Sequence, residues 1–146
     1  LRLSIRDNGR GIPPEDVPRV SDPFYTSRLT RKVGLGLPLL RQSAEHCEGC
    51  FRLASELGKG TLVEAEFRLS HWDRAPLGDM TGTLMSLIVG RPEVDFVYRQ
   101  KAGGEEFVVD TREIKEALDG LPLSHPEVIG FLRDSLREGL AGLGEI

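Results

Sequence analysis

Long hydrophobic runs are absent from this sequence. The longest, from Leu84 to Val89, is far shorter than the roughly 18 apolar residues that a membrane-spanning helix needs, and its length suits a buried strand. We therefore expect no membrane segment in this stretch of chain.

The sequence also starts without methionine and without a basic and apolar leader, so we expect it to be a fragment of a longer protein.

Cysteine is scarce. The two cysteines, Cys47 and Cys50, form the motif CEGC, which lacks the second pair or well-placed histidine that a tetrahedral zinc site requires. No thioredoxin-like strand precedes it. A metal or redox role is the weaker alternative, and the pattern favours a structural role, with one thiol buried at the end of a helix and the other at the start of a strand.

A strong excess of charge is missing as well. The chain has 146 residues, 39% of them hydrophobic and 29% charged, as in an ordinary folded domain with a net charge of −4. There are 11 basic and 9 acidic residues up to Ser70 (+2), and 8 basic and 14 acidic residues from His71 onward (−6). The first half is compatible with binding an anion, but +2 is too weak to indicate nucleic acid. Two solvated surfaces of different composition explain the split equally well.

Hydrophobic periodicity predicts three strands and a helix in the first half. Apolar and polar residues alternate over residues 1–6, which indicates a strand that runs into the glycine-rich turn DNGRGIP at residues 7–13. Residues 14–33 are expected to form a loop with a short helical turn after Pro14. Alternation around Gly58–Thr61 predicts an antiparallel hairpin, whose apolar face a helix covers. That helix carries the stripe Leu37, Leu40, Ala44 and Cys47.

The second half is predicted to be a small α+β domain. Prolines and glycines within residues 71–82 place a boundary near residue 72, which separates domains 1–72 and 73–146. Strands are expected over 84–89, 94–99 and 106–110. Asp110 with Glu113, and Ser124 with Glu127, resemble capping boxes that open two helices. The second helix carries an apolar stripe at Val128, Leu132, Leu136, Leu140 and Leu143.

The turn DNGRGIP combines an acid at a strand end with two glycines. Gly9 and Gly11 permit positive φ and let the backbone approach a flat ligand. Asp7 can accept a hydrogen bond from an exocyclic amine, as adenine would offer. A plain turn explains the same residues about equally well when the motif is taken alone.

The segment VGLGLPLL places two glycines just before a helix. Unpaired N–H groups and the helix dipole at such a position favour phosphate oxygens, and the upstream cations Arg28, Arg31 and Lys32 add positive charge. The segment matches neither the Walker pattern nor the dinucleotide pattern. A flexible loop with a glycine hinge and solvated cations is the alternative.

Four motifs in order, DNGRGIP, DPFYTSR, VGLGLPLL and SELGKGTLVEAEFRLS, resemble the ATP-binding boxes of the sensor histidine kinase branch of the GHKL (Bergerat-fold) ATPases. The likeness extends from Leu1 to about Ser70. It implies the C-terminal part of an α/β sandwich, with a helix on a mixed sheet, so the whole chain falls in the α+β class.

The resemblance also implies roles for individual residues. Asp7 would hold the adenine amino group, and Thr61 would close the adenine side through water. Phe24 would pack within a mobile lid, and Arg28 and Lys32 would lie near the phosphates. The nucleotide-binding set that the resemblance implies is Asp7, Gly9, Gly11, Ile12, Phe24, Arg28, Lys32, Gly34, Leu35, Gly36, Leu37 and Thr61.

Two parts of the family's machinery have no counterpart in these residues. The helix whose asparagine binds magnesium and which carries the catalytic acid would precede Leu1, and the helix with the phosphoacceptor histidine is also missing. The catalytic residues are therefore unknown from this sequence and are expected upstream, together with the Mg²⁺ ligand, and we expect the isolated fragment to be inactive.

These motifs predict a bacterial, cytoplasmic signalling ATPase of the histidine kinase type. In the intact protein, ATP would be bound and its γ-phosphate transferred to a protein histidine, or hydrolysed. The alternative is a nucleotide-dependent switch or an interaction module without phosphotransfer. We expect residues 73–146 to bind a protein partner with a basic surface, and a dimer is plausible.

Overall fold

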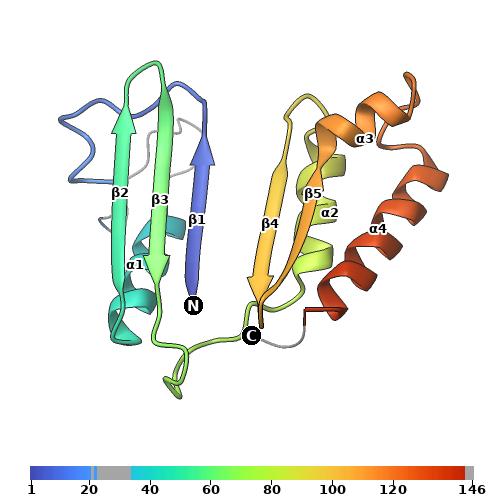
Figure 1. Ribbon diagram of the computed structural model, residues 1–146. Coiled ribbons are helices and arrows are strands. Elements are labelled where there is room, and N and C mark those ends of the chain that lie inside the picture. The colour runs from blue at the N-terminus through green and yellow to red at the C-terminus, as the bar shows by residue number, and fades with distance from the viewer. Residues whose placement is uncertain (21, 23–33, 144–146) are drawn as a thin grey trace. The chain divides into compact units, whose positions relative to one another are not determined.

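The computed structural model describes residues 1–20, 22 and 34–143. Contacts divide the chain into two compact units, Leu1–Ala75 and Pro76–Ile146. Each unit combines an antiparallel sheet with one or more helices (Figure 1), so the predicted α+β class is confirmed. None of the helices in the described ranges is long and apolar enough to cross a membrane.

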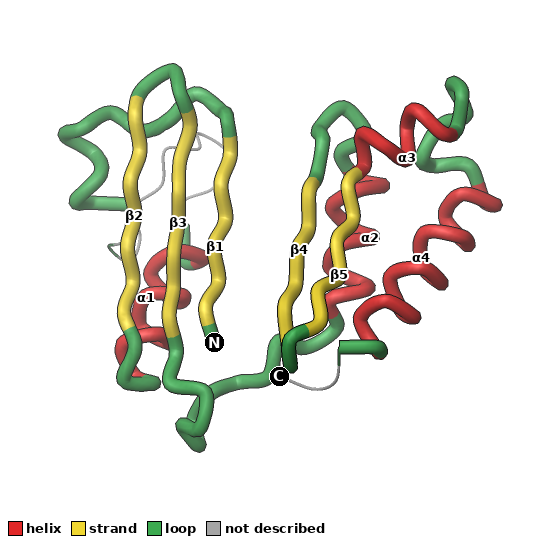
Figure 2. The backbone as a smooth tube through the Cα atoms, viewed as in Figure 1, coloured by secondary structure: helices red, strands yellow, loops and turns green. Residues whose placement is uncertain are grey.

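The first unit is a three-stranded sheet with one helix on it. The strands β1 (Arg2–Asp7), β2 (Cys50–Glu56) and β3 (Gly60–Glu66) lie in the order β1-β3-β2, and both neighbouring pairs are antiparallel (Figure 2). The helix α1 (Gly36–His46) packs against β2 and β3. The predicted hairpin and the predicted helix are thus both present.

Alternation along the strands separates an apolar face from a polar face. Val63 and Ala65 of β3 are buried, as are Ala44 of α1 and Cys47 just after it, so the helix covers the apolar face. On the other face, the Arg2 guanidinium lies 2.6 Å from a carboxylate oxygen of Glu64. Burial on one side and ion pairing in solvent on the other are the arrangement expected of a one-sided antiparallel sheet.

The motif CEGC makes the turn from α1 into β2. Cys47 is 1% exposed at the end of the helix, and Cys50 begins the strand, as the structural interpretation predicted. Glu48 adopts a positive φ of 54°, and the Gly49 N–H donates to the Ala44 carbonyl at 2.9 Å. A Cβ on Gly49 would lie 1.7 Å from the Glu66 carbonyl oxygen, so this close approach requires glycine.

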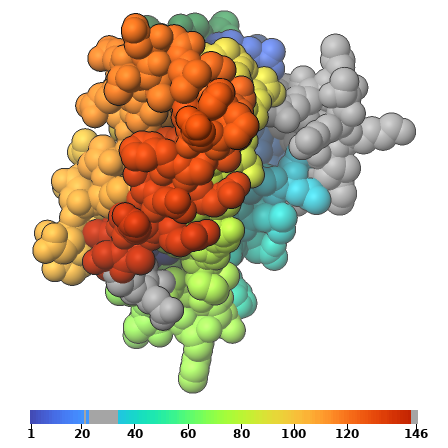
Figure 3. Space-filling model, turned by 90° about the vertical axis from the view of Figure 1, so that its right-hand side faces the viewer, coloured from blue at the N-terminus to red at the C-terminus, as the bar shows by residue number. Residues whose placement is uncertain are grey.

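The second unit packs three helices against a two-stranded hairpin. Its elements are α2 (Met80–Gly90), β4 (Val97–Ala102), β5 (Glu105–Asp110), α3 (Thr111–Ala117) and α4 (Pro126–Ala141). Helices α3 and α4 form much of the surface that faces the viewer in Figure 3. The buried core of this unit consists of Leu84, Met85, Ile88, Leu123, Val128, Leu132 and Leu136.

The strand predicted over Leu84–Val89 is wrong, because these residues lie within the helix α2. A short apolar run fits a buried strand and a buried helix equally, and periodicity alone cannot separate them. Asp79 is the N-cap of this helix, and its carboxylate accepts a hydrogen bond from the Gly82 N–H at 2.8 Å. Leu84 and Ile88, four residues apart, then face α4 in the core.

Two further boundaries differ from the prediction. The strand expected over 94–99 begins at Val97 and continues to Ala102, so that only Gly103 and Gly104, both with positive φ, turn into β5. The residue that precedes α4 as its N-cap is His125 and not Ser124, and among the described residues no side chain caps this helix end. Asp110 does cap α3, as predicted, by accepting from the Arg112 N–H at 2.9 Å.

Candidate functional site

Three polar side chains lie level with one another at one end of the first sheet. The strand register pairs Asp7 with Thr61 across β1 and β3, and Thr61 with Ser55 across β3 and β2. Directly opposite residues of antiparallel strands point to the same face of the sheet. The apolar stripes of the three strands therefore end in a polar row, Asp7–Thr61–Ser55.

Ser55 connects the elements around this row. Its hydroxyl donates to the Gly60 carbonyl at 2.9 Å and accepts from the Ile12 N–H at 2.9 Å. The Thr61 Oγ1 lies 3.0 Å from the Ser55 Oγ. Because a serine hydroxyl carries one hydrogen, which the Gly60 carbonyl receives, the Thr61 hydroxyl is the donor in this contact. One side chain thus joins the hairpin tip to the glycine turn.

The glycine turn lies against the tip of the β2–β3 hairpin. The Gly58 N–H donates to the Arg10 carbonyl at 2.7 Å. Gly11 has a φ of 69°, and a Cβ there would lie 2.0 Å from the Glu56 carbonyl oxygen. Of the two glycines in the turn that permit a positive φ, Gly11 adopts one, whereas Gly9 is not among the glycines with positive φ. Position 11 therefore requires glycine, because its φ is positive and a Cβ there would collide with the Glu56 carbonyl.

Asp7 occupies the exposed end of the polar row. Its Oδ1 accepts a hydrogen bond from the Gly9 N–H at 2.8 Å, and within the described residues its Oδ2 has no partner. Gly60 fixes the strand end, because a Cβ at this buried glycine would lie 2.0 Å from the Asp7 carbonyl oxygen. The carboxylate is therefore held in place and has one oxygen available to accept a donor.

A second candidate region is the start of α1. Leu35 is the N-cap residue and Gly36 begins the helix, with no side-chain cap and no acidic residue in the first turn among the described residues. The first N–H groups of any helix lack an intrahelical partner. A Cβ on Gly36 would meet no described atom within 4 Å, so the approach to this helix end is open within the described part of the chain.

The structure places the predicted site residues in two groups. Five of them cluster at the sheet end, and Gly34, Leu35, Gly36 and Leu37 lie at the start of α1. No hydrogen bond between described residues joins these groups. Phe24, Arg28 and Lys32 lie outside the described residues. The group at the sheet end is Asp7, Gly9, Gly11, Ile12 and Thr61.

Sequence reasoning did not assign Ser55 to the site. A signal was present, because Ser55 is a polar residue in the inward-facing series Phe51, Leu53, Ser55.

Within the described ranges, no group of three His, Cys, Asp or Glu side chains could hold a metal ion, and this includes Cys47 and Cys50.

Comparison with known proteins gives a family for the first unit. Residues 1–71 match the family described as histidine kinase-, DNA gyrase B-, and HSP90-like ATPase. Sensor histidine kinase YxdK of Bacillus subtilis is 35% identical over 69 residues, which cover 44% of this chain and 21% of the relative. Sensor protein ChvG of Rhizobium meliloti is 40% identical over 72 residues, covering 45% of this chain and 12% of the relative. The chain thus spans a small part of the length of these relatives.

Proposed function

We propose that residues 1–71, which match the histidine kinase-like ATPase family, supply one side of an ATP site in a bacterial, cytoplasmic signalling protein. In the intact protein the bound ATP would donate its γ-phosphate to a protein histidine, or would be hydrolysed. The single observation that carries the proposal is the polar row Asp7–Thr61–Ser55, over whose end the glycine turn is hydrogen bonded.

The adenine end of the site is proposed to lie at this row. The Oδ2 of Asp7, which has no partner within the described residues, suits the exocyclic amine of adenine, because a carboxylate oxygen accepts and the amine donates. Gly9, Gly11 and Ile12 would line the floor beneath the base, where the turn is supported by Ser55. The Thr61 hydroxyl donates to Ser55 and keeps its lone pairs to accept a bridging water.

The phosphate end is proposed to lie at the start of α1. The first N–H groups of a helix, which lack an intrahelical partner, and the positive end of the helix dipole favour phosphate oxygens. Gly36 leaves room for such oxygens, since an added Cβ would meet open space among the described residues. Gly34, Leu35 and Leu37 would contribute backbone N–H groups at the same helix end. Arg28 and Lys32 would add positive charge near the phosphates. Phe24 would pack within the mobile lid that the family resemblance implies.

Magnesium is proposed to be held by residues that precede Leu1 in the intact protein. The described residues hold no group of three His, Cys, Asp or Glu side chains that fits a metal ion, and the family resemblance assigns the ion to an asparagine on an upstream helix. Bound Mg²⁺ would neutralise the charge of the phosphates. Ile5, which is 60% exposed on the same face as Asp7, is an apolar surface that this upstream part would cover.

The alternative proposal is a nucleotide-dependent switch. The second unit has its own core and carries none of the four ATP-binding motifs. In this alternative, ATP bound to the first unit would control a partner of residues 73–146 without phosphotransfer. Pairing of two copies is compatible with either proposal, because β1 is an edge strand among the described strands.

Incubation of the intact protein with γ-labelled ATP and Mg²⁺ separates these functions. Acid-labile, base-stable label on the protein would indicate phosphohistidine, and release of labelled phosphate would indicate hydrolysis. Binding of ATP without either product would favour the switch. Absence of ATP binding at millimolar concentrations by calorimetry would overturn the proposal.

A further inference from the structure

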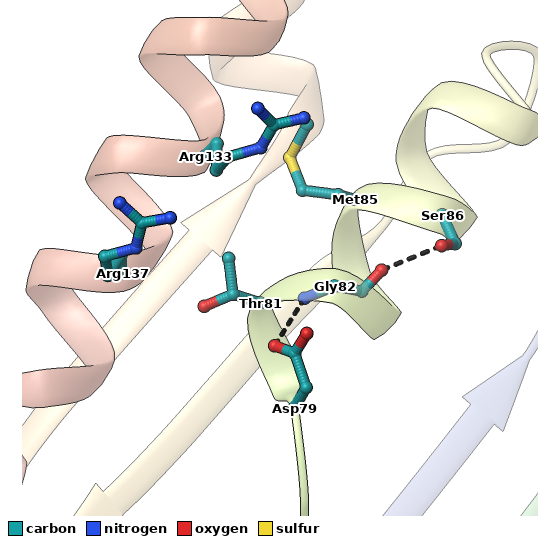
Figure 4. Close-up of a pocket in the computed structure, with 7 residues that line it drawn as sticks. All are labelled: Asp79, Thr81, Gly82, Met85, Ser86, Arg133 and Arg137. Carbon is teal, nitrogen blue, oxygen red and sulfur yellow. Dashed lines mark hydrogen bonds between the residues drawn. The ribbon is translucent and has the colours of Figure 1, made fainter.

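The second unit contains a hollow between the start of α2 and the side of α4 that carries Arg133 and Arg137. Its volume is about 510 Å³, enough for an oxyanion together with the group that carries it. Every residue that lines it belongs to the second unit, so it is separate from the proposed ATP site (Figure 4). The lining residues used below are Asp79, Thr81, Gly82, Arg133 and Arg137.

Two arginines supply positive charge on one side of the hollow. Arg133 and Arg137 are four residues apart on α4, and their side chains extend from the same face of the helix toward α2 (Figure 4). Among the described residues Arg133 has no ion-pair or hydrogen-bond partner, and the nearest carboxylate to Arg137, that of Asp134, is 3.8 Å away. Two like charges at this spacing repel each other, and an anion between them would remove that repulsion.

The start of α2 forms the other side of the hollow. The Thr81 side chain points toward Arg137 (Figure 4), and within the described residues its hydroxyl has no partner. The Gly82 N–H is already used, because it donates to Asp79 Oδ1 at 2.8 Å. Within the described residues, the walls therefore offer the guanidinium group of Arg133 and the hydroxyl of Thr81 without partners, and the guanidinium group of Arg137, which has only the 3.8 Å ion pair with Asp134. The carboxylate of Asp79 opposes an anion.

We propose that this hollow binds a phosphate group, either as inorganic phosphate or as a phosphate monoester. Guanidinium groups match the oxygens of a tetrahedral phosphate with paired N–H donors, and the hydroxyl of Thr81 adds a donor from the opposite side. The two arginines and Asp79 leave the lining with a net charge of +1. Because Asp79 repels the ligand, binding is weakened unless the rest of a phosphorylated partner adds contacts.

Titration of the full chain with inorganic phosphate, and separately with O-phosphoserine, at constant ionic strength tests the proposal. The readout is the movement of the amide NMR signals of Thr81 and Gly82 and of the Nε–H signals of Arg133 and Arg137. These signals come from residues of the second unit, whereas phosphate bound at the start of α1 is followed separately by the amide signals of Gly36 and Leu37. Saturating shifts with both ligands are expected, and tighter binding of O-phosphoserine would identify an ester as the natural ligand.

Substitutions of the lining residues test whether their charges determine the affinity for phosphate. The double substitution Arg133→Gln with Arg137→Gln should weaken binding by about tenfold or more, whereas the control Arg91→Gln, at the far end of α2, should leave it unchanged. Asp79→Asn should tighten binding by roughly threefold, because asparagine keeps the N-cap acceptor and removes the opposing charge. Equal binding by the double variant and the native chain, or no tightening in Asp79→Asn, would overturn the proposal.

Discussion

Ser55 and Thr61 face each other across β2 and β3, with 3.0 Å between their hydroxyl oxygens. Thr61 is in turn level with Asp7 on β1. The motif resemblance assigns both Asp7 and Thr61 to the adenine end of the site, and the two residues share one row although they are 54 positions apart in the chain. Ser55 supports the row from its other end.

Ser55→Ala should destabilise the first unit by about 1–3 kcal/mol, since the Ile12 N–H and the Gly60 carbonyl would lose their partner in a partly buried position. Urea denaturation followed by circular dichroism measures the change. Ser4→Ala, on the polar face of β1, is the matched control and should change stability by less than about 0.5 kcal/mol. Equal stability of the two variants would contradict the role given to Ser55.

Asp7→Asn should weaken ATP binding by the intact protein by about 1–3 kcal/mol, because a carboxylate oxygen that accepts from adenine would be replaced by an amide. The amide oxygen can still accept from the Gly9 N–H, so the turn should keep its conformation. Isothermal titration calorimetry gives the affinity, with Asp73→Asn, outside the site, as the control. An unchanged affinity would remove Asp7 from the adenine site.

Gly11→Ala should displace the glycine turn. The new Cβ would lie 2.0 Å from the Glu56 carbonyl oxygen, at a φ of 69° that costs a non-glycine residue roughly 1–2 kcal/mol by itself. Gly58→Ala has a similar φ of 80° but meets no described atom within 4 Å, so it isolates the conformational cost. Thermal denaturation of both variants should show the larger loss for Gly11→Ala, and a loss no larger than that of Gly58→Ala would mean that the turn adjusts freely.

Thr111→Val should destabilise the second unit by about 1–3 kcal/mol. Thr111 is 0% exposed, and its hydroxyl accepts a hydrogen bond from the Phe96 N–H at 2.8 Å. The backbone N–H of Thr111 donates to the Phe96 carbonyl at 2.9 Å. Valine keeps the shape and leaves the Phe96 N–H unpaired. Thr83→Val, at an exposed site on α2, serves as the control in the same denaturation experiment, and equal effects would assign no special role to the Thr111 hydroxyl.

The stability of the second unit should fall as the pH drops from about 4 to about 2. Hydrogen bonds from the side chain and the backbone N–H of Arg112 lower the pKa of Asp110 from 3.8 to about 2. Because the folded pKa is below the unfolded one, the stabilisation is present above 3.8 and is lost as Asp110 is protonated in the folded state. Unfolding followed at pH 2–5 should show a shallower dependence for Asp110→Asn than for the native chain or for Asp134→Asn, and parallel curves would refute this.

Several elements were predictable because local sequence specifies them. The hairpin of β2 and β3 follows from alternation around Gly58–Thr61, and α1 follows from its apolar stripe. The motifs were sufficient for the family resemblance, which the match of residues 1–71 confirms. In each case the pattern lies within a short stretch of sequence, so the prediction does not depend on any long-range contact.

Other elements depended on contacts between distant residues. Leu84–Val89 is helical because it packs against α4, and the same apolar run would also suit a strand. The link between Ser55 and the glycine turn depends on the N–H of Ile12, 43 positions away, which donates to the Ser55 hydroxyl. The Arg133 and Arg137 side chains border a hollow only because α2 lies beside α4.

The α+β class, the one-sided hairpin and the family resemblance of residues 1–71 follow from the amino-acid sequence alone, because periodicity and glycine motifs are local properties. The helical state of α2, the row of Asp7, Thr61 and Ser55, and the arginine-lined hollow follow from the tertiary structure. Each of these depends on strand register or on helix packing, which join residues that the chain keeps far apart.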